Sequence, residues 1–407
     1  MPSPSPQRSH LQRSFLLSLL CVASIHSRSV FCNANSKAKE QRTLIVQNKP
    51  VPLGLCNQLY SIIHGIITAE IAGAKHYNLT TMMFHHERNV SFQQMSWRPN
   101  PASRILDIDC LNRRWHSRKQ NEMHIGTSYT GATPVDETVN VPFNADVLGR
   151  IHEYSVPARA RQIALYLEAK KNSSSVSVTW DHIRWAHVDS TALFPHAVHS
   201  LCFAEKLHEI ARKAIHAMMA ASGSLEYFSV HLRVEADFRT HPYLLNKGYS
   251  ELLQYCPNTT SCIQNFYSNT LRRVVPHDAA LYIASGIFDE SVEAKHLVQT
   301  VLKPVTKNIF ANHDLIPIEV RKSLSPEELA AVDFMICHRS QTFVGFPGSS
   351  FAALVAQARY GSGEGSIFVR AFGTLPLGDT IPLWLSNDFL LTCSQSTFGD
   401  DSIDCNV

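Results

Sequence analysis

Several signatures that would assign a function at once are missing from this chain of 407 residues. Lys and Arg number 37 against 34 Asp and Glu, the formal net charge is only +3, and there is no long basic run. Proteins that bind nucleic acid usually carry a basic patch, so no nucleic-acid partner is expected. The GxSxG, Walker A, GxGxxG and HExxH patterns are also absent. Their absence removes the most easily recognised hydrolase, nucleotidase, dinucleotide-binding and metalloprotease motifs.

Long hydrophobic runs are scarce as well. The run Phe15–Ile25 follows Arg8 and Arg13 and has about eleven residues, the length of a signal-peptide core and too short to span a membrane. We expect residues 1–34 to be a cleaved secretory signal, with a short signal-anchor, and hence a type II membrane protein, as the alternative. Four N-glycosylation sequons agree with a route through the lumen of the endoplasmic reticulum or Golgi: Asn78, Asn89, Asn172 and Asn258.

The ten cysteines lack the CxxC spacing of a structural zinc site. In an oxidising lumen they are expected to form disulfides instead. Cys256 and Cys262 are close enough in sequence to close a small loop, and Cys393 and Cys405 are a second such pair in the expected C-terminal tail, 393–407. The overall connectivity stays open, because sequence alone does not determine it.

The composition, 44% hydrophobic and 17% charged, is typical of a soluble globular protein, and the length suits two domains. We expect an N-terminal domain over 42–222, on the acceptor side, and a C-terminal domain over 225–392. The small residues Ser222-Gly223-Ser224 mark the joint between them.

The first domain opens with a strand–loop–helix pattern. Thr43–Gln47 is a predicted strand, a loop rich in proline follows, and isoleucines at helical spacing predict a helix from Cys56. Leu79–Phe84 is the predicted second strand. The stretch 92–180 is expected to hold loops and short helices, and His199–Ala221 is predicted to be one amphipathic helix.

The second domain alternates strands and helices more regularly, which predicts an α/β fold with a parallel sheet. The strands are expected at Tyr227–Leu232, Ala280–Ser285, Asn308–Phe310 and Thr342–Gly345. The helices are expected at Ser261–Val274, Ser291–Leu302, from Ser325-Pro326 onward, and at Ser349–Arg359.

A cluster of charge ends the strand in the segment Glu226–Asp237, EYFSVHLRVEAD. His231, Arg233, Glu235 and Asp237 fall within seven residues, and ligands of open α/β sheets bind at the carboxyl ends of strands. The guanidinium of Arg233 suits two phosphate oxygens. A strand followed by a solvated polar loop is the alternative interpretation.

Ser349, Ser350 and the amide of Phe351 form a second candidate group. They begin a predicted helix after a glycine turn, where free N–H groups and the helix dipole favour phosphate. A simple helix cap is the alternative. Together with Arg233 they predict a diphosphate site, which the loop and helix start at Gly54–Gln58 would face from the other domain.

Two acidic or histidine clusters were weighed as metal sites. Asp107 and Asp109 have suitable spacing but lie in an apolar context, so a structural role is predicted. His85-His86-Glu87 has metal-binding side chains without a companion set. No metal site is therefore predicted.

With these residues assembled, the sequence resembles the GDP-fucose protein O-fucosyltransferases. Three blocks, in order through most of the mature chain, carry the resemblance. They are Gly54-Leu55-Cys56-Asn57-Gln58, then His231-Leu232-Arg233 extended through Asp237, and then Val332-Asp333-Phe334, Ser340, Phe343-Val344-Gly345 and Ser349-Ser350-Phe351.

The resemblance implies a GT-B fold, with two Rossmann-like domains whose parallel sheets face a cleft. It implies inverting transfer of fucose from GDP-fucose to a hydroxyl, with no cofactor and no obligatory metal. Arg233 would hold the β-phosphate and Asn57 would position the reacting sugar or acceptor. The other implied roles are substrate binding by Gly54, Gln58, His231, Ser349, Ser350 and Phe351, and support by Glu235 and Asp237.

The expected function is therefore transfer of fucose to a Ser or Thr hydroxyl of a protein in the secretory pathway. Cys56 and Gln341 stand where related sequences often carry a glycine and an acid. These departures leave two alternatives open: a GT-B transferase that uses another nucleotide sugar or a glycan acceptor, and a non-catalytic homologue that binds sugar or protein.

Overall fold

The computed structural model describes residues 43–48, 52–71, 73–85, 96–117, 123–127, 137–141, 175–180, 193–235, 256–290, 292–346, 349–361, 366–369 and 402–404. All of them belong to one compact unit, Thr43–Val407. The expected signal segment 1–34 and the pair Cys393 and Cys405 lie outside the described residues. Among the described helices, none is long and apolar enough to cross a membrane.

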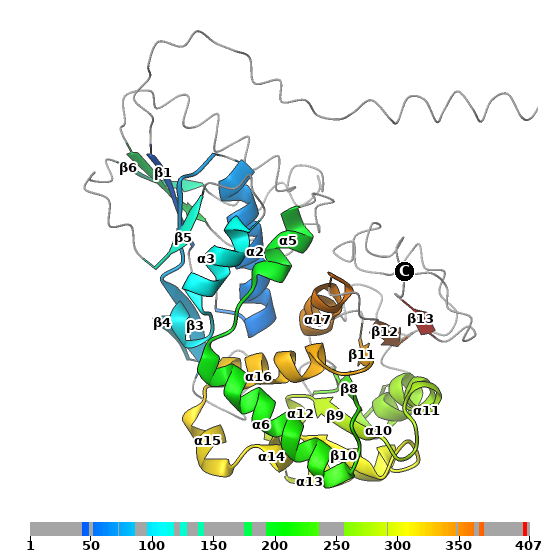
Figure 1. Cartoon of the computed structure of the whole chain (residues 1–407). Coiled ribbons are helices and arrows are strands. Elements are labelled where there is room, and N and C mark those ends of the chain that lie inside the picture. The colour runs from blue at the N-terminus through cyan, green and yellow to red at the C-terminus, as the bar shows by residue number, and fades with distance from the viewer. Residues whose placement is uncertain are drawn as a thin grey trace, which may run out of the picture. The chain divides into compact units, whose positions relative to one another are not determined.

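The first sheet has five parallel strands in the order β5-β2-β1-β7-β6 (Figure 1). Strand β1 comes first in the chain and lies in the middle, with later strands on both of its sides. The chain therefore leaves β1 at a point where the strand order reverses, which is where ligands of such sheets bind. The bounds are β1 Thr43–Asn48, β2 His76–Asn78, β5 His124–Gly126, β6 Glu137–Val141 and β7 Ser175–Trp180.

Two predictions for this half were wrong. Strand β3 (Thr81–His85), which covers most of the predicted second strand, pairs antiparallel with β4 (Trp97–Pro101) in a separate two-stranded sheet. The neighbour of β1 is instead the three-residue β2, too short to show a hydrophobic pattern. The stretch 92–180 holds three strands of the main sheet as well as β4. Two of these, β6 and β7, alternate with polar residues and were not recognised as sheet.

The helices of this half are α2 (Leu55–Ile71), α3 (Ile108–His116), α5 (Leu193–Ser200) and α6 (Glu205–Ser222). The predicted helix 199–221 is in fact the end of α5 and the whole of α6. The chain leaves helical geometry between them, where Cys202 forms a disulfide with Cys110. Helix α6 ends at Gly223, whose φ of 68° is the left-handed conformation that glycine adopts without strain.

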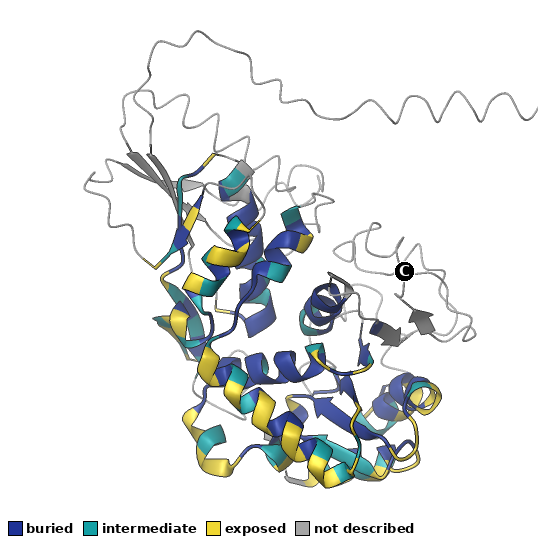
Figure 2. Ribbon diagram, in the orientation of Figure 1, coloured by how far each residue is buried: buried dark blue, intermediate teal, exposed yellow. Residues whose placement is uncertain are grey.

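The second sheet has six strands in the order β10-β9-β8-β11-β12-β13, and only β13 is antiparallel. Strands β8 and β9 are buried along their whole length (Figure 2). The strand bounds are β8 Tyr227–His231, β9 Ala280–Ala284, β10 Asn308–Ala311, β11 Phe343–Gly345, β12 Ser366–Val369 and β13 Ser402–Asp404. The helices are α10 Thr259–Cys262, η5 Ile263–Ser268, α11 Asn269–Val274, α12 Ile287–Glu290, α13 Val292–Leu302, α14 Asn312–Leu315, α15 Ile318–Ser323, α16 Pro326–His338 and α17 Ser350–Gly361.

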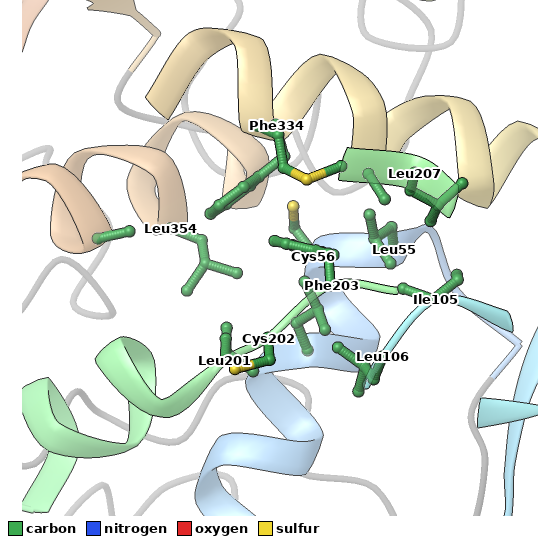
Figure 3. Packing of buried hydrophobic residues seen from close by; sticks show 14 of the residues in the cluster. Leu55, Cys56, Ile105, Leu106, Leu201, Cys202, Phe203, Leu207, Phe334 and Leu354 are labelled. Carbon is green, nitrogen blue, oxygen red and sulfur yellow. The ribbon is translucent and has the colours of Figure 1, made fainter. Parts of the chain in front are cut away.

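A single hydrophobic cluster joins helices of both halves. Cys56 at the start of α2 lies near Phe334 of α16, and Leu354 of α17 faces the same cluster (Figure 3). This packing places the beginning of α2 beside the helices that cover the second sheet. The two mainly parallel sheets confirm the predicted α/β, GT-B fold class.

Candidate functional site

The site lies where the strand order of the second sheet reverses. Strand β8 comes first, β9 and β10 follow on one side, and β11 and β12 follow on the other. Ser229 is level with Phe343, and Val230 with Val344, so β8 and β11 end side by side. Ligands of doubly wound sheets bind at this point, outside the carboxyl ends of the strands.

Beyond β8 the side chains continue to alternate between two sides of the extended chain. Leu232 and Val234 are completely buried in the core of the second sheet. Their alternation places His231, Arg233 and Glu235 together on the other side, since successive side chains of extended backbone point in opposite directions. Three of the predicted site residues therefore share one side. Asp237 lies outside the described residues.

Arg233 is held at both its backbone and its side chain. Its N–H donates to the hydroxyl of Tyr267 over 2.9 Å, and its guanidinium donates to Oε2 of Glu235 over 2.7 Å. The side chain is 29% exposed. Its positive charge is thus fixed in direction and still accessible to an anionic ligand.

Glu235 is a buried support for Arg233. Its Oε1 accepts hydrogen bonds from the Ser285 hydroxyl (3.1 Å) and the Gly286 N–H (2.8 Å), both at the end of β9. Burial acts to raise the pKa of Glu235, but the charge of Arg233, together with the hydrogen bonds, outweighs it and lowers the pKa. The carboxylate therefore stays ionised and links Arg233 to the neighbouring strand.

His231 is a neutral, buried ring beside this ion pair. It stacks on Phe351 with ring centroids 4.7 Å apart, and its Nδ1 has no hydrogen-bond partner among the described residues. Burial lowers the pKa of His231 from 6.5 to about 4, with Arg233 lowering it further and Glu235 opposing the shift. A buried ring nitrogen without a partner leaves a hydrogen-bonding position open to a ligand.

The beginning of α17 completes this side. Ser349 is buried and precedes the helix, where its Oγ accepts from the N–H of Ala352 at 3.5 Å, which is the helix cap of the alternative interpretation. Ser350 and Phe351 are partly exposed and form the first turn. Free N–H groups and the positive end of the helix dipole are thereby presented next to β8.

The loop that leads into α2 is held by hydrogen bonds of the Gln58 side chain to the backbone, referred to as the glutamine clamp. Gln58 is buried; its amide nitrogen donates to the carbonyls of Leu53 and Met83, and its oxygen accepts from the N–H of Met83. The carboxamide of Gln58 is thus engaged with backbone, and its predicted substrate contact stays a prediction. Gly54 is exposed and Asn57 is partly exposed at the start of α2.

Strand β3, held by this clamp, and Arg104, which follows β4, both contact the first turn of α16. His85 Nδ1 lies 2.6 Å from Oε1 of Glu327, and Arg104 donates twice to the carboxylate of Glu328, at 3.1 and 2.6 Å. Both acids are almost completely buried. The sequence identified them only as early helix acids, and nothing in their spacing indicated partners more than 200 positions away.

The clusters weighed as metal sites have other roles where they are described. His85 pairs with Glu327, while His86 and Glu87 lie outside the described residues. Asp107 caps α3 by accepting from the N–H of Cys110, as its structural interpretation predicted. Within the described parts of the chain, no three metal-binding side chains are grouped.

A buried arginine that the sequence did not reveal shapes the turn before β11. Arg359 of α17 is fully buried and donates to the carbonyls of His338, Ser340 and Gln341. These carbonyls follow the end of α16, where a cation also complements the helix dipole. Arg359 thereby connects α17 to the segment that leads into β11.

Comparisons with known proteins identify the family of this chain. Residues 159–360 match the family model described as GDP-fucose protein O-fucosyltransferase. No curated protein matches the sequence significantly. Among solved structures, POFUT1 in complex with GDP-fucose is 13% identical over 78% of this chain and 94% of that chain, with a TM-score of 0.49.

Two bacterial-type neighbours show a similar degree of likeness. NodZ α-1,6-fucosyltransferase co-crystallised with GDP is 12% identical over 83% of this chain and 98% of that chain, with a TM-score of 0.43. Fucosyltransferase NodZ from Bradyrhizobium is 12% identical over 81% and 95%, with a TM-score of 0.43. The family assignment rests on the sequence match, which spans β7 to β11 and most of α17. By that match the chain belongs to the GDP-fucose protein O-fucosyltransferase family, and it is a glycosyltransferase.

Proposed function

We propose that the protein transfers fucose from GDP-fucose to a Ser or Thr hydroxyl of a protein in the lumen of the secretory pathway. In this proposal the configuration at the anomeric carbon of fucose is inverted. Membership of the family supports GDP-fucose as the donor, and the family description supports a protein hydroxyl as the acceptor.

One observation carries the proposal. Arg233 is oriented by Glu235 at the end of β8, next to the first turn of α17. A guanidinium and a helix N-terminus both favour phosphate oxygens, and here they stand on two adjacent strands at the point where the strand order reverses. A nucleoside diphosphate placed there meets positive charge from both, with the His231–Phe351 stack beside it.

The reaction needs this positive charge where the diphosphate departs. The acceptor hydroxyl oxygen attacks C1 of fucose on the face opposite GDP, the bond between C1 and the β-phosphate oxygen breaks with its electron pair going to GDP, and the hydroxyl proton is released to water. A single displacement inverts C1. Arg233 and the amides of α17 stabilise the charge that develops on GDP, which is where electrostatic catalysis acts most strongly. Asn57 offers both a donor and an acceptor to orient the sugar or the attacking hydroxyl.

Glu235 does not suit the role of general base. One carboxylate oxygen accepts from Arg233, the other accepts from Ser285 and Gly286, and its pKa is lowered. A base needs a free oxygen within reach of the hydroxyl and a pKa near the working pH. Glu235 therefore contributes to the reaction by orienting Arg233, and not by accepting the proton of the hydroxyl.

An acceptor screen tests the proposal. The purified protein is incubated with GDP-fucose and, in parallel, folded EGF-like repeats, thrombospondin-type repeats and simple glycans. Fucose on a Ser or Thr side chain with the α configuration by NMR is the expected product. Three results would contradict the proposal: transfer only to glycans, a product in which fucose keeps the β configuration, and turnover only with another nucleotide sugar. Asn57→Ala serves as a matched variant on the acceptor side and should lower transfer.

Two structural features support a luminal location. The disulfides Cys110–Cys202 and Cys256–Cys262 suit an oxidising compartment. Of the sequons, Asn78 is buried in β2, whereas Asn258 is exposed before α10. We expect an N-glycan at Asn258 and none at Asn78. Peptide mapping after glycosidase treatment checks this, and a protein without luminal glycans would count against the location.

A further inference from the structure

The segment that follows β8 is hydrogen-bonded to a helix that contains a π turn. Tyr267 is completely buried, and its hydroxyl accepts the N–H of Arg233 over 2.9 Å. It belongs to η5, Ile263–Ser268, which is a π-helix rather than an α-helix. The hydroxyl of Ser268 donates to the carbonyl of Ile263, five positions earlier, which matches the wider turn. Such π turns are rare and occur frequently at functional sites.

The side chains of this turn are part of the core. Phe266, Tyr267 and Ser268 are consecutive and all three are buried. Tyr267 reaches Arg233 from within the helical run of α10, η5 and α11.

A disulfide fixes the beginning of this turn. Cys262, the residue immediately before η5, is bonded to Cys256. Both sulfurs are buried in the same cluster as Leu232, Val234 and Tyr267. The disulfide, the π turn and the segment around Arg233 therefore form one packed unit, in which the tyrosine hydroxyl makes the polar contact to the chain of Arg233.

We propose that Tyr267 is a positioning residue for the transfer reaction, which sets the direction of the Arg233 side chain by holding its backbone N–H. The proposal rests on the proposed function, since it takes Arg233 as the phosphate-binding group. Glu235 holds the guanidinium and Tyr267 holds the main chain, so the two together leave the arginine little freedom other than toward the ligand. Because the arginine is already ordered, less conformational entropy is lost when the diphosphate binds.

Burial keeps the tyrosine suited to this role. It raises the pKa of Tyr267, so the hydroxyl stays protonated. The neutral hydroxyl accepts from Arg233 without placing a negative charge next to the guanidinium, where it would compete with phosphate. A phenylalanine at this position keeps the ring and removes only the acceptor.

The test compares two buried tyrosines. Tyr267→Phe is expected to weaken GDP binding about fivefold, the effect of one hydrogen bond. Tyr227→Phe is the matched control, because Tyr227 is buried on the same strand segment at the other end of β8 and donates to the carbonyl of Ile336 over 2.8 Å. It should shift the melting temperature without changing the Kd for GDP beyond about twofold. Equal effects of the two variants on GDP binding would overturn the proposal.

A double-mutant cycle separates this inference from the proposed function. Arg233→Lys should weaken GDP binding by about tenfold, since lysine lacks the planar fork. In that background Tyr267→Phe should add less than about twofold, because the geometry it protects is already lost. If Arg233→Lys leaves the Kd unchanged, the proposed phosphate anchor is wrong. If Arg233→Lys weakens binding but Tyr267→Phe does so equally in both backgrounds, or not at all, only the role of Tyr267 is wrong.

Hydrogen exchange provides a measurement on the unaltered protein. The Arg233 amide should be protected like that of Leu232, which donates to the carbonyl of Ala284 over 3.0 Å. In Tyr267→Phe, protection should fall at Arg233 and persist at Leu232. Rapid exchange of the Arg233 amide in the unaltered protein contradicts the proposal even if the variant fails to fold.

Discussion

Replacing His231 by phenylalanine should change how the protein's stability depends on pH. The pKa of His231 is lowered from 6.5 to about 4 because the ring is buried, so the folded protein holds it neutral while the unfolded chain protonates it. The unfolded state therefore takes up the proton first, and stability is lost as the pH falls from about 6.5 toward 4. The full gap corresponds to about 3 kcal/mol, of which about 2 kcal/mol is lost by pH 5.

His231→Phe keeps an aromatic ring against Phe351 and cannot titrate. Urea unfolding of both proteins at pH 7, 6 and 5 gives the difference in free energy of unfolding, in which the contributions of all other groups largely cancel. The variant should gain about 2 kcal/mol relative to the wild type between pH 7 and pH 5. His338→Phe is a positive control, because burial and the charge of Arg359 also lower the pKa of His338 to about 4. Parallel curves for the wild type and His231→Phe would refute the assignment of a neutral, buried His231.

Three further substitutions test other parts of the account. Arg233→Ala should lower transfer by at least about 100-fold without unfolding the protein, since Glu235 keeps its two hydrogen bonds from the end of β9; near-normal transfer would rule out the anchor. Gly65→Ala places a methyl group against the hydroxyl and ring of the buried Tyr77, and thermal unfolding should show a loss of about 1 to 3 kcal/mol. Arg104→Ala removes the ion pair at the first turn of α16 and should cost about 2 kcal/mol, whereas an unchanged midpoint would show that the pair does not hold the segment after β4 against α16.

The second sheet could be predicted from the sequence because its strands are buried and apolar. Strand β9 is hydrophobic throughout, and β8 is interrupted only by Ser229 before it ends at His231. Ser325 and Pro326 marked the start of α16, where the structure shows a capping box of Ser325 and Glu328. Buried strands and helix caps are recognisable from a few neighbouring residues. The strands and helices of the second half could therefore be predicted without knowing which distant residues they contact.

The strands of the first sheet were harder to predict, because they are short or only partly hydrophobic. Strand β2 has only three residues, too few for a pattern. Strands β6 and β7 do alternate valine with polar side chains, a pattern typical of a half-buried strand, but the prediction of loops and short helices for 92–180 missed it. The disulfide Cys256–Cys262 was predicted from a separation of six and is confirmed. Cys110–Cys202 spans 92 positions and depends on α3 and α5 packing together, which sequence alone does not show.

The site shows the same division between local and distant information. The sequence predicted a charged cluster with His231, Arg233 and Glu235 at the end of a strand, and the structure adds that the three lie on one side of the extended chain. The sequence did not reveal the groups that hold them, because Tyr267 and Gly286 come from other elements. The residues that hold a functional side chain in place are brought to it by tertiary packing, and a single sequence does not show which residues these are.

Calorimetric titration with GDP, UDP and ADP tests the central claim most directly. We expect tight binding of GDP, weak binding of the other two nucleotides, and loss of the GDP signal in Arg233→Ala, because the diphosphate loses its guanidinium. Measurable transfer or hydrolysis of GDP-fucose should accompany binding in the unaltered protein. Preference for UDP, or equal GDP affinity in Arg233→Ala, would contradict the account.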